Sequence, residues 1–200
     1  MTSSTANTGG IQPDGVLTPA DLQPNADRQA PAYPTTASIT LTHLAEQDAA
    51  GVLDLHHIVF GPGRFARTAF RLRETATPLS AYSFVARKDG DLVGAVSMSR
   101  ITVGTVPGAL LGPLAVRRSL RDVGIGKMLL MAAVDAAFAG QEPYVLLVGD
   151  LPYYAAAGFV RVPFGQVIMP GPVDPLRLLV ARNPDPSATT NIPQGEARGI

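Results

Sequence analysis

Three stretches in the middle of the chain carry apolar residues at the spacing of an α-helix. Glu46–Phe60 is the first, and Gly61-Pro62-Gly63 is expected to end it. Arg64–Ala76 is the second, with Phe65, Ala69 and Leu72 on one side and Arg64, Arg67 and Arg71 on another. Gly126–Ala139 is the third. It is apolar on nearly every side, so we expect this helix to be buried.

Alternating or wholly apolar runs between these stretches predict strands. Ala81–Arg87 and Leu92–Val103 alternate, and the Asp-Gly pair between them suits a hairpin turn with positive φ. The other predicted strands are Ser38–Leu44, Ala109–Val116, Tyr144–Val148, Val160–Val162 and Leu176–Ala181. A short helix at Tyr153–Ala157 should end at Gly158. The resulting order is β-α-α-β-β-β-α-β-α-β-β, an α/β (α+β) arrangement.

The two ends of the chain show no such periodicity. Residues 1–36 are rich in Pro, Thr, Ser, Ala, Asn and Asp, and residues 183–200 have a similar composition. Segments of this kind cannot bury enough apolar surface to offset the entropy of ordering them. We therefore expect one compact domain over residues 37–182, with a disordered N-terminal arm and a disordered C-terminal tail.

Composition narrows the classes of function. The chain has 200 residues and no Cys, which excludes disulfides, thiolate metal sites and cysteine nucleophiles. Sixteen basic and sixteen acidic residues cancel, which argues against nucleic acid as the main partner. Three His do not readily form a metal site without carboxylates. The first residues lack the features of a signal peptide, and the apolar stretch at Ile101–Val116 is too short to span a membrane. We expect a cytoplasmic protein without a metal or a membrane partner.

The most informative segment runs from Leu110 to Ala133. A strand ending near Val116 leads through a loop with two glycines into a helix, and backbone N–H groups at a helix start bind anions. The side chains from Arg117 to Lys127 sum to four positive charges and one negative charge. A phosphorylated cofactor would fit such a loop. The segment departs from a Walker A loop because Met128 follows Lys127, and from the dinucleotide fingerprint because the third glycine is missing. The remaining alternative is a plain glycine turn before a buried helix.

A second segment, Val148–Val162, carries a pair of tyrosines after a strand end. A phenol beside a cofactor loop can donate a proton. The alternative reading is packing, since tyrosines often precede a glycine-capped helix for structural reasons.

Together the two segments resemble the GNAT superfamily of acetyl-CoA-dependent N-acetyltransferases. Arg121-Asp122-Val123-Gly124-Ile125-Gly126 is similar to the family pattern Q/R-x-x-G-x-G/A, and it follows a strand that ends Leu114-Ala115-Val116. Tyr154-Ala155-Ala156-Ala157-Gly158-Phe159 matches the later Tyr-x-x-x-Gly-Phe. The run Gly149-Asp150-x-x-Tyr153-Tyr154 resembles a bacterial branch with a Gly-Asp-Pro-x-Tyr-Tyr signature. Three departures are Arg118 where members often carry Pro, Asp122 where they often carry Gly, and Leu151-Pro152 in place of Pro-x.

The resemblance implies a mixed, mostly antiparallel twisted sheet flanked by helices, and acetyl-CoA as co-substrate. It implies that the N–H groups of Asp122, Val123, Gly124, Ile125, Gly126 and Lys127 hold the pyrophosphate, with Arg121 contributing. Backbone groups of Leu114 and Val116 would pair with the pantetheine arm, and the N–H near Leu114 or Ala115 would polarise the thioester carbonyl. Tyr154 would be the general acid that protonates the departing thiolate after direct attack by a primary amine.

The sequence leaves the acceptor and the base open. Candidates for the base are Asp150, Glu46, Asp54, Glu74, His56 and His57. The histidines also fit a structural or solvent-facing role, and Asp150 fits a helix cap. The Arg64, Arg67, Arg71 stripe suits either an acidic acceptor or a solvated helix face. We expect the acceptor to be a small-molecule or amino-terminal amine, without a more specific identity, and homodimerisation is left open. The main alternative function is a non-catalytic acyl-CoA sensor, followed by a structural α/β interaction domain.

Overall fold

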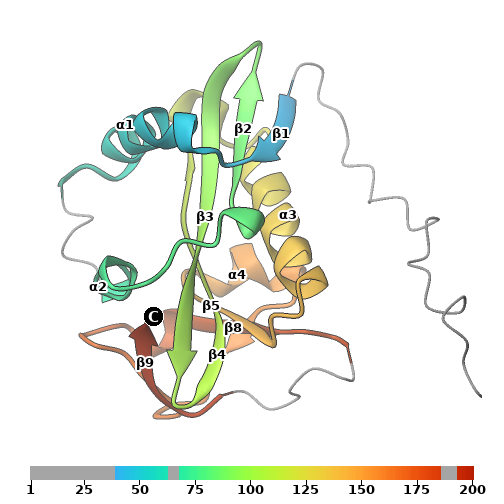
Figure 1. The fold of residues 1–200 in the computed structure, drawn as a ribbon. Helices are drawn as coiled ribbons and strands as arrows, with labels where there is room; N and C mark the ends of the chain where they lie inside the picture. The colour runs from blue at the N-terminus through green and yellow to red at the C-terminus, as the bar shows by residue number, and fades with distance from the viewer. Residues whose placement is uncertain (1–38, 63–67, 186–192) are drawn as a thin grey trace, which may run out of the picture. The chain divides into compact units, whose positions relative to one another are not determined.

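The computed structural model describes residues 39–62, 68–185 and 193–200. Within these ranges the chain forms a sheet with helices on both faces (Figure 1). The strands are β1 (Ile39–His43), β2 (Phe84–Lys88), β3 (Asp91–Val103), β4 (Val106–Val116), β5 (Tyr144–Val148), β6 (Val160–Arg161), β7 (Val167–Ile168), β8 (Leu178–Arg182) and β9 (Gly195–Gly199). Along the sheet their order is β1-β2-β3-β4-β5-β8-β6. Every neighbouring pair in this order is antiparallel except β4 and β5, which confirms the mixed, mostly antiparallel sheet.

The helices lie on two sides of this sheet. They are α1 (Ala49–Phe60), α2 (Thr68–Glu74), α3 (Ile125–Ala139) and α4 (Leu151–Tyr154). In Figure 1, α1 and α2 lie on one side of the sheet and α3 on the other. The buried side chains agree, because Val85 packs with α1 whereas its neighbour Ala86 packs with α3. The predicted start of α2, including Phe65, lies outside the described residues.

Local chain chemistry explains where most of these elements start and stop. Asp89 and Gly90 take φ values of 51° and 89°, as the hairpin between β2 and β3 requires. Gly158 takes a φ of 82° and ends the turn that follows α4. Several predicted boundaries are wrong. The strand expected from Ala81 begins at Phe84, because Ser80–Tyr82 form a 3-10 turn. The strand expected from Leu176 begins at Leu178, because Pro175–Arg177 form another, and the strand expected from Ala109 begins at Val106.

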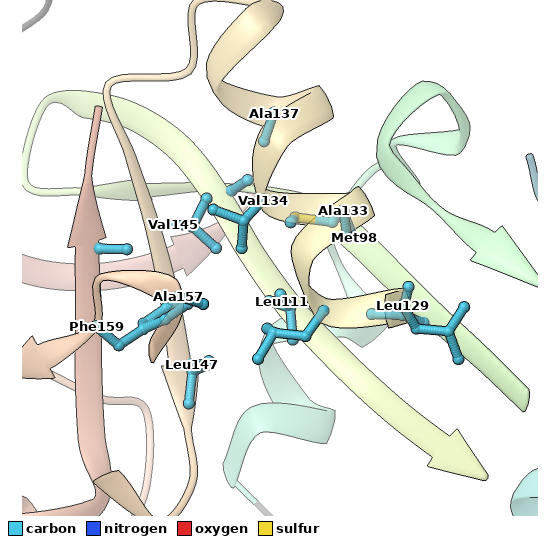
Figure 2. Packing of buried hydrophobic residues seen from close by; sticks show 14 of the residues in the cluster. Met98, Leu111, Leu129, Ala133, Val134, Ala137, Val145, Leu147, Ala157 and Phe159 are labelled. Atoms are coloured by element: carbon cyan, nitrogen blue, oxygen red, sulfur yellow. The ribbon is translucent and has the colours of Figure 1, made fainter. Parts of the chain in front are cut away.

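The largest core cluster joins α3 to one face of the sheet. In Figure 2, Ala133, Val134 and Ala137 of α3 lie among Met98, Leu111, Val145 and Leu147 of the strands, with Phe159 and Ala157 beside them. Gly94 permits the close approach of this helix, because a Cβ there would lie 2.9 Å from Leu129 Cδ1. Only one face of α3 is fully buried, since Lys127 and Asp135 are exposed. The expectation of a helix buried all round is therefore wrong.

The C-terminal segment also differs from its prediction. Gly195–Gly199 forms β9 rather than a disordered tail, and it pairs with Ile101–Val103 of β3 and with β7. One edge of β3 pairs with β4. The other edge pairs first with β2, over the first half of β3, and then with β9, near its end. Ala197 of β9 is buried in the core beside Leu72 of α2. The predicted N-terminal arm, residues 1–36, lies outside the described residues.

Candidate active site

An opening between β4 and β5 defines the site. In the described chain, residue pairing between these parallel strands covers Ala109 with Val145 and Leu110 with Leu146. Beyond that point β4 continues to Val116 and β5 to Val148, and the two strands diverge. Their carboxyl ends therefore frame a gap in the sheet, the place where α/β folds commonly bind ligands.

A β-bulge sets the direction of the backbone groups along this gap. Val96 pairs with Leu114 and Met98 with Leu111, so Gly112 and Pro113 both stand opposite Ser97. The Arg117 N–H donates to the Val93 carbonyl, at 2.8 Å. Since hydrogen-bonded pairs alternate in an antiparallel ladder, Ala115 also directs its backbone groups toward β3. Leu114 and Val116 direct theirs toward the gap.

The loop after β4 leads into the first turn of α3. Asp122 and Gly124 take φ values of 65° and 89°, so the chain turns sharply before the helix. The first hydrogen bond of α3 runs from the Met128 N–H to the Gly124 carbonyl, at 3.0 Å. Helix geometry then gives the preceding N–H groups of the first turn no acceptor inside the helix. These donors, the helix dipole and the exposed side chains of Arg121 and Lys127 together favour an anion.

One cavity of about 1160 Å³ passes from this loop to the opposite side of the sheet. Its floor includes the β4 bulge and the end of β5. The α3 side of its wall includes Leu120, Arg121, Asp122, Gly124, Ile125, Gly126, Lys127, Tyr153 and Tyr154. On the other side α1 contributes Leu53, His56, Val59 and Phe60, and α2 contributes Thr68, Ala69, Phe70 and Arg73. Pro172, Val173, Asp174 and Arg177 complete the wall. The Thr68 hydroxyl donates to the Pro172 carbonyl and joins α2 to this last segment.

Tyr154 lies where β5 ends. Its ring packs against Gly149, where an added Cβ would overlap the ring, and it makes edge contacts with Tyr153 and Phe159 at centroid distances of 4.9 and 5.9 Å. Burial raises the pKa of Tyr154 to about 12, and the nearby Tyr153 and Asp150 add to that rise. The phenol is therefore protonated throughout the physiological range. The neighbouring Tyr153 points elsewhere. Its hydroxyl lies against Gly126 of α3, where an added Cβ would overlap it.

Two candidate bases reach the cavity. His56 of α1 lies in its wall, partly buried, with its ring 5.8 Å from that of Phe60. Asp150 lies at the cavity edge, but its carboxylate forms an ion pair with Arg177, with Oδ1 3.0 Å from Nε, and does not cap α4. The other candidates do not line the cavity within the described chain; they are Glu46, Asp54, Glu74 and His57.

Most of the predicted site residues meet in this cavity. Leu114, Val116, Arg121, Asp122, Gly124, Ile125, Gly126, Lys127 and Tyr154 all line it. Ala115 does not, because it is buried against α1, and Val123 points to solvent with 39% exposure. Arg71 is exposed and does not line the cavity, which agrees with a solvated helix face; Arg64 and Arg67 lie outside the described residues.

Sequence reasoning missed the far wall of the cavity. Arg73, Phe70 and Arg177 carried no recognisable motif, and their approach to β4 depends on how distant segments pack. The helical period of α2 did contain a signal, because Arg73 follows Ala69 by four residues and so lies on the apolar side of the helix, away from the Arg64, Arg67, Arg71 stripe. No cluster of three or more potential metal-ligating His, Asp or Glu side chains occurs among the described residues. Nor does that part of the chain contain a helix long and apolar enough to cross a bilayer.

The chain belongs to the acetyltransferase (GNAT) family, whose family model matches residues 50–161. This range includes all of α1 but its first residue, the loop before α3 and both tyrosines of the site. No curated protein matches the chain as a relative.

Solved structures show the same fold. A GNAT family N-acetyltransferase from Escherichia coli, solved in complex with CoA, has a TM-score of 0.66 and 22% identity; the match covers 82% of this chain and 90% of that one. A GNAT family acetyltransferase from Brucella melitensis, solved with acetyl-CoA, has a TM-score of 0.59 and 21% identity over 81% and 96%. The ribosomal-protein-S18-alanine N-acetyltransferase from Escherichia coli has a TM-score of 0.52 and 16% identity over 77% and 98%.

Proposed function

We propose that this chain transfers an acetyl group from acetyl-CoA to a primary amine by direct attack of the amine on the thioester. The observation that carries the proposal is the meeting of three features in one cavity: the first turn of α3, the diverging edge of β4 and the phenol of Tyr154. The two family members solved with CoA or acetyl-CoA support the choice of donor.

The first turn of α3 fits the pyrophosphate of the donor. Its amides from about Asp122 to Lys127 supply backbone donors, and Arg121 and Lys127 supply positive charge beside them. The acidic Asp122 is exposed, so its charge is well solvated. The free backbone edge at Leu114 and Val116 suits the amide groups of the pantetheine arm, which would extend the sheet as a short extra strand.

The acyl carbonyl would lie beside the β4 bulge. The Leu114 N–H points toward the gap, whereas that of Ala115 points toward β3. Leu114 is therefore the better donor for polarising the thioester carbonyl. A fixed N–H stabilises the negative charge that develops on this oxygen as the amine attacks.

Tyr154 would donate a hydrogen bond from its hydroxyl to the sulfur as the C–S bond breaks.

The amine must be neutral to attack, and an α-amino group with a pKa near 8 is partly neutral at physiological pH. Between the two candidate bases in the cavity, His56 is favoured because Asp150 is held by Arg177. His56 would take the amine proton, directly or through a water molecule.

A panel of primary amines incubated with acetyl-CoA tests the proposal. We expect stoichiometric release of CoA, measured with a thiol reagent, and a matching gain of one acetyl group on the amine by mass spectrometry. Binding of acetyl-CoA without acetylation of any amine would instead favour the non-catalytic sensor. Failure to bind acetyl-CoA would contradict both functions.

A further inference from the structure

We propose that the acceptor is an amine that also carries a carboxylate, as a free amino acid does, and that Arg73 binds this carboxylate. The inference rests on the proposed acetyl transfer, since it names the class of acceptor for the same cavity. It is carried by the position of the Arg73 guanidinium beside the β4 bulge.

Arg73 projects from α2 toward the floor of the cavity. Its Nη1 lies 3.8 Å from the position that a Cβ on Gly112 would occupy, so the guanidinium lies beside β4 at the bulge. Gly112 is two residues before Leu114, whose N–H faces the gap. The guanidinium carbon also lies 5.8 Å from the centre of the Phe70 ring, a distance at which the cation and the ring attract. The charge is thus held on the α1 and α2 side of the point where amine and thioester would meet.

The surroundings favour an anion there over a second cation. The side chains that α1 and α2 contribute to the described cavity wall include one arginine and no carboxylate. Two acidic residues line the cavity between the end of β5 and Arg177. Asp150 is paired with Arg177, and Asp174 accepts the Leu176 N–H at 2.9 Å. A polyamine would find no carboxylate for its second charge among the described residues of the α1 and α2 wall.

The rest of the wall suggests the body of this acceptor. Leu53, Val59, Phe60 and Phe70 add apolar surface to the same side of the cavity. An amino acid with an apolar side chain would place its carboxylate on Arg73 and its side chain against these residues. Arginine forms paired hydrogen bonds with a carboxylate, which also fixes the orientation of the neighbouring amine.

Arg71 provides a matched control on the same helix. It has the same charge and lies two residues earlier, but it is exposed and its Nη1 faces Gly171, at 3.4 Å from where a Cβ would lie. It does not line the cavity. A general effect of charge on α2 should therefore appear equally in Arg71→Gln and Arg73→Gln, whereas carboxylate binding should appear in Arg73→Gln alone.

The test compares leucine, methionine and phenylalanine with their amides as acceptors, at one pH and saturating acetyl-CoA. We expect the wild type to prefer each acid over its amide in kcat/KM. Arg73→Gln should lower kcat/KM for the acids about 10- to 100-fold, the effect of losing a hydrogen bond to a charged group, and change the amides by less than about threefold. Comparing the same acceptors between variants cancels the intrinsic reactivity of each amine. An equal loss for acids and amides, or a wild type without preference for the acids, would overturn the inference.

A binding experiment separates this inference from the proposed function. If no amine is acetylated, the proposed function fails, and titration calorimetry of the CoA-saturated protein with N-acetylleucine and N-acetylleucinamide decides about Arg73. At least tenfold tighter binding of the acid, lost in Arg73→Gln and kept in Arg71→Gln, would support a carboxylate site. Equal binding, or no binding of either compound, would overturn it.

Discussion

Replacing Tyr154 by Phe removes one hydroxyl from the cavity and leaves the ring. The ring is the part that packs against Gly149 and Phe159, so the folded state should lose little stability. If the phenol serves the departing thiolate, turnover should fall while the affinity for acetyl-CoA stays nearly constant, because the hydroxyl is needed as the sulfur becomes charged.

The raised pKa of Tyr154 indicates whether its hydroxyl transfers a proton or donates a hydrogen bond. Burial raises it to about 12. An alkyl thiol has a pKa near 8.5, so full transfer of the proton to a free thiolate would be uphill by about 3.5 pKa units, or about 5 kcal/mol. The phenol is therefore expected to act mainly by donating a hydrogen bond to the developing charge. Such a bond to a charged group contributes about 1.5–3 kcal/mol, so kcat should fall about 10- to 100-fold, at or below the lower end of the range for general acids.

The assay is the initial rate of CoA release with an acceptor from the amine panel, together with the melting temperature and the acetyl-CoA affinity of each variant. Tyr153→Phe is the control, since its hydroxyl lies at Gly126 instead of near the end of β5, and its loss should be milder. Turnover of Tyr154→Phe at the wild-type rate would refute the reasoning, because the sulfur would then be served by water or another residue. A 10⁴-fold loss would show that the proton is transferred fully.

Three further predictions concern the donor loop, the C-terminal strand and alkaline stability. Gly126→Val should abolish acetyl-CoA binding while the circular dichroism spectrum stays native. Because the new side chain would also meet the Tyr153 hydroxyl, the control is the same substitution in a Tyr153→Ala background, where binding should remain lost. Recovery of binding there would assign the defect to the tyrosine instead. Deleting residues 193–200 removes β9 with its pairing to β3. The free energy of unfolding should fall by several kcal/mol, because each lost hydrogen bond contributes about 0.5–1.5 kcal/mol. An unchanged denaturation midpoint would contradict the role of this strand. Burial raises the pKa of Tyr144 above its usual 10, so the stability that its protonated form gives the folded state should be complete below pH 10 and lost above it. Denaturation series at pH 8, 10 and 11.5 should show this decline, and Tyr144→Phe should reduce it.

Local patterns were enough to predict most elements of the fold. The hairpin at Asp89-Gly90 and the helix end at Gly158 need positive φ, and residues of these types are the ones that adopt it readily. The strand Tyr144–Val148 is apolar throughout because it is covered on both faces. The start of α3 and its glycines were likewise visible, since an anion loop needs small residues before the helix.

Other features depend on contacts between distant residues. Gly195–Gly199 contains a single apolar residue and two glycines, so nothing in its pattern predicts the strand that forms against the open edge of β3. The bulge at Gly112-Pro113 shifts the alternation of β4, so that Leu111 and Leu114 face the same core. Because of this shift, the backbone N–H of Leu114 rather than that of Ala115 faces the gap between β4 and β5. Arg73 was not among the residues singled out on this helix, since the orientation of α2 is set by Leu72 packing on the sheet.

The central claim is that the first turn of α3 and the edge of β4 hold acetyl-CoA. Thermal unfolding with acetyl-CoA and with acetyl-pantetheine, which lacks the pyrophosphate and the nucleotide, tests it most directly. At a hundredfold excess over Kd, acetyl-CoA should stabilise the protein by about 2.7 kcal/mol, which for a domain of this size raises the melting temperature by about 5–10 °C. Acetyl-pantetheine at the same concentration should raise it far less. Equal shifts from both compounds, or none from either, would contradict the assignment of this loop as the pyrophosphate site.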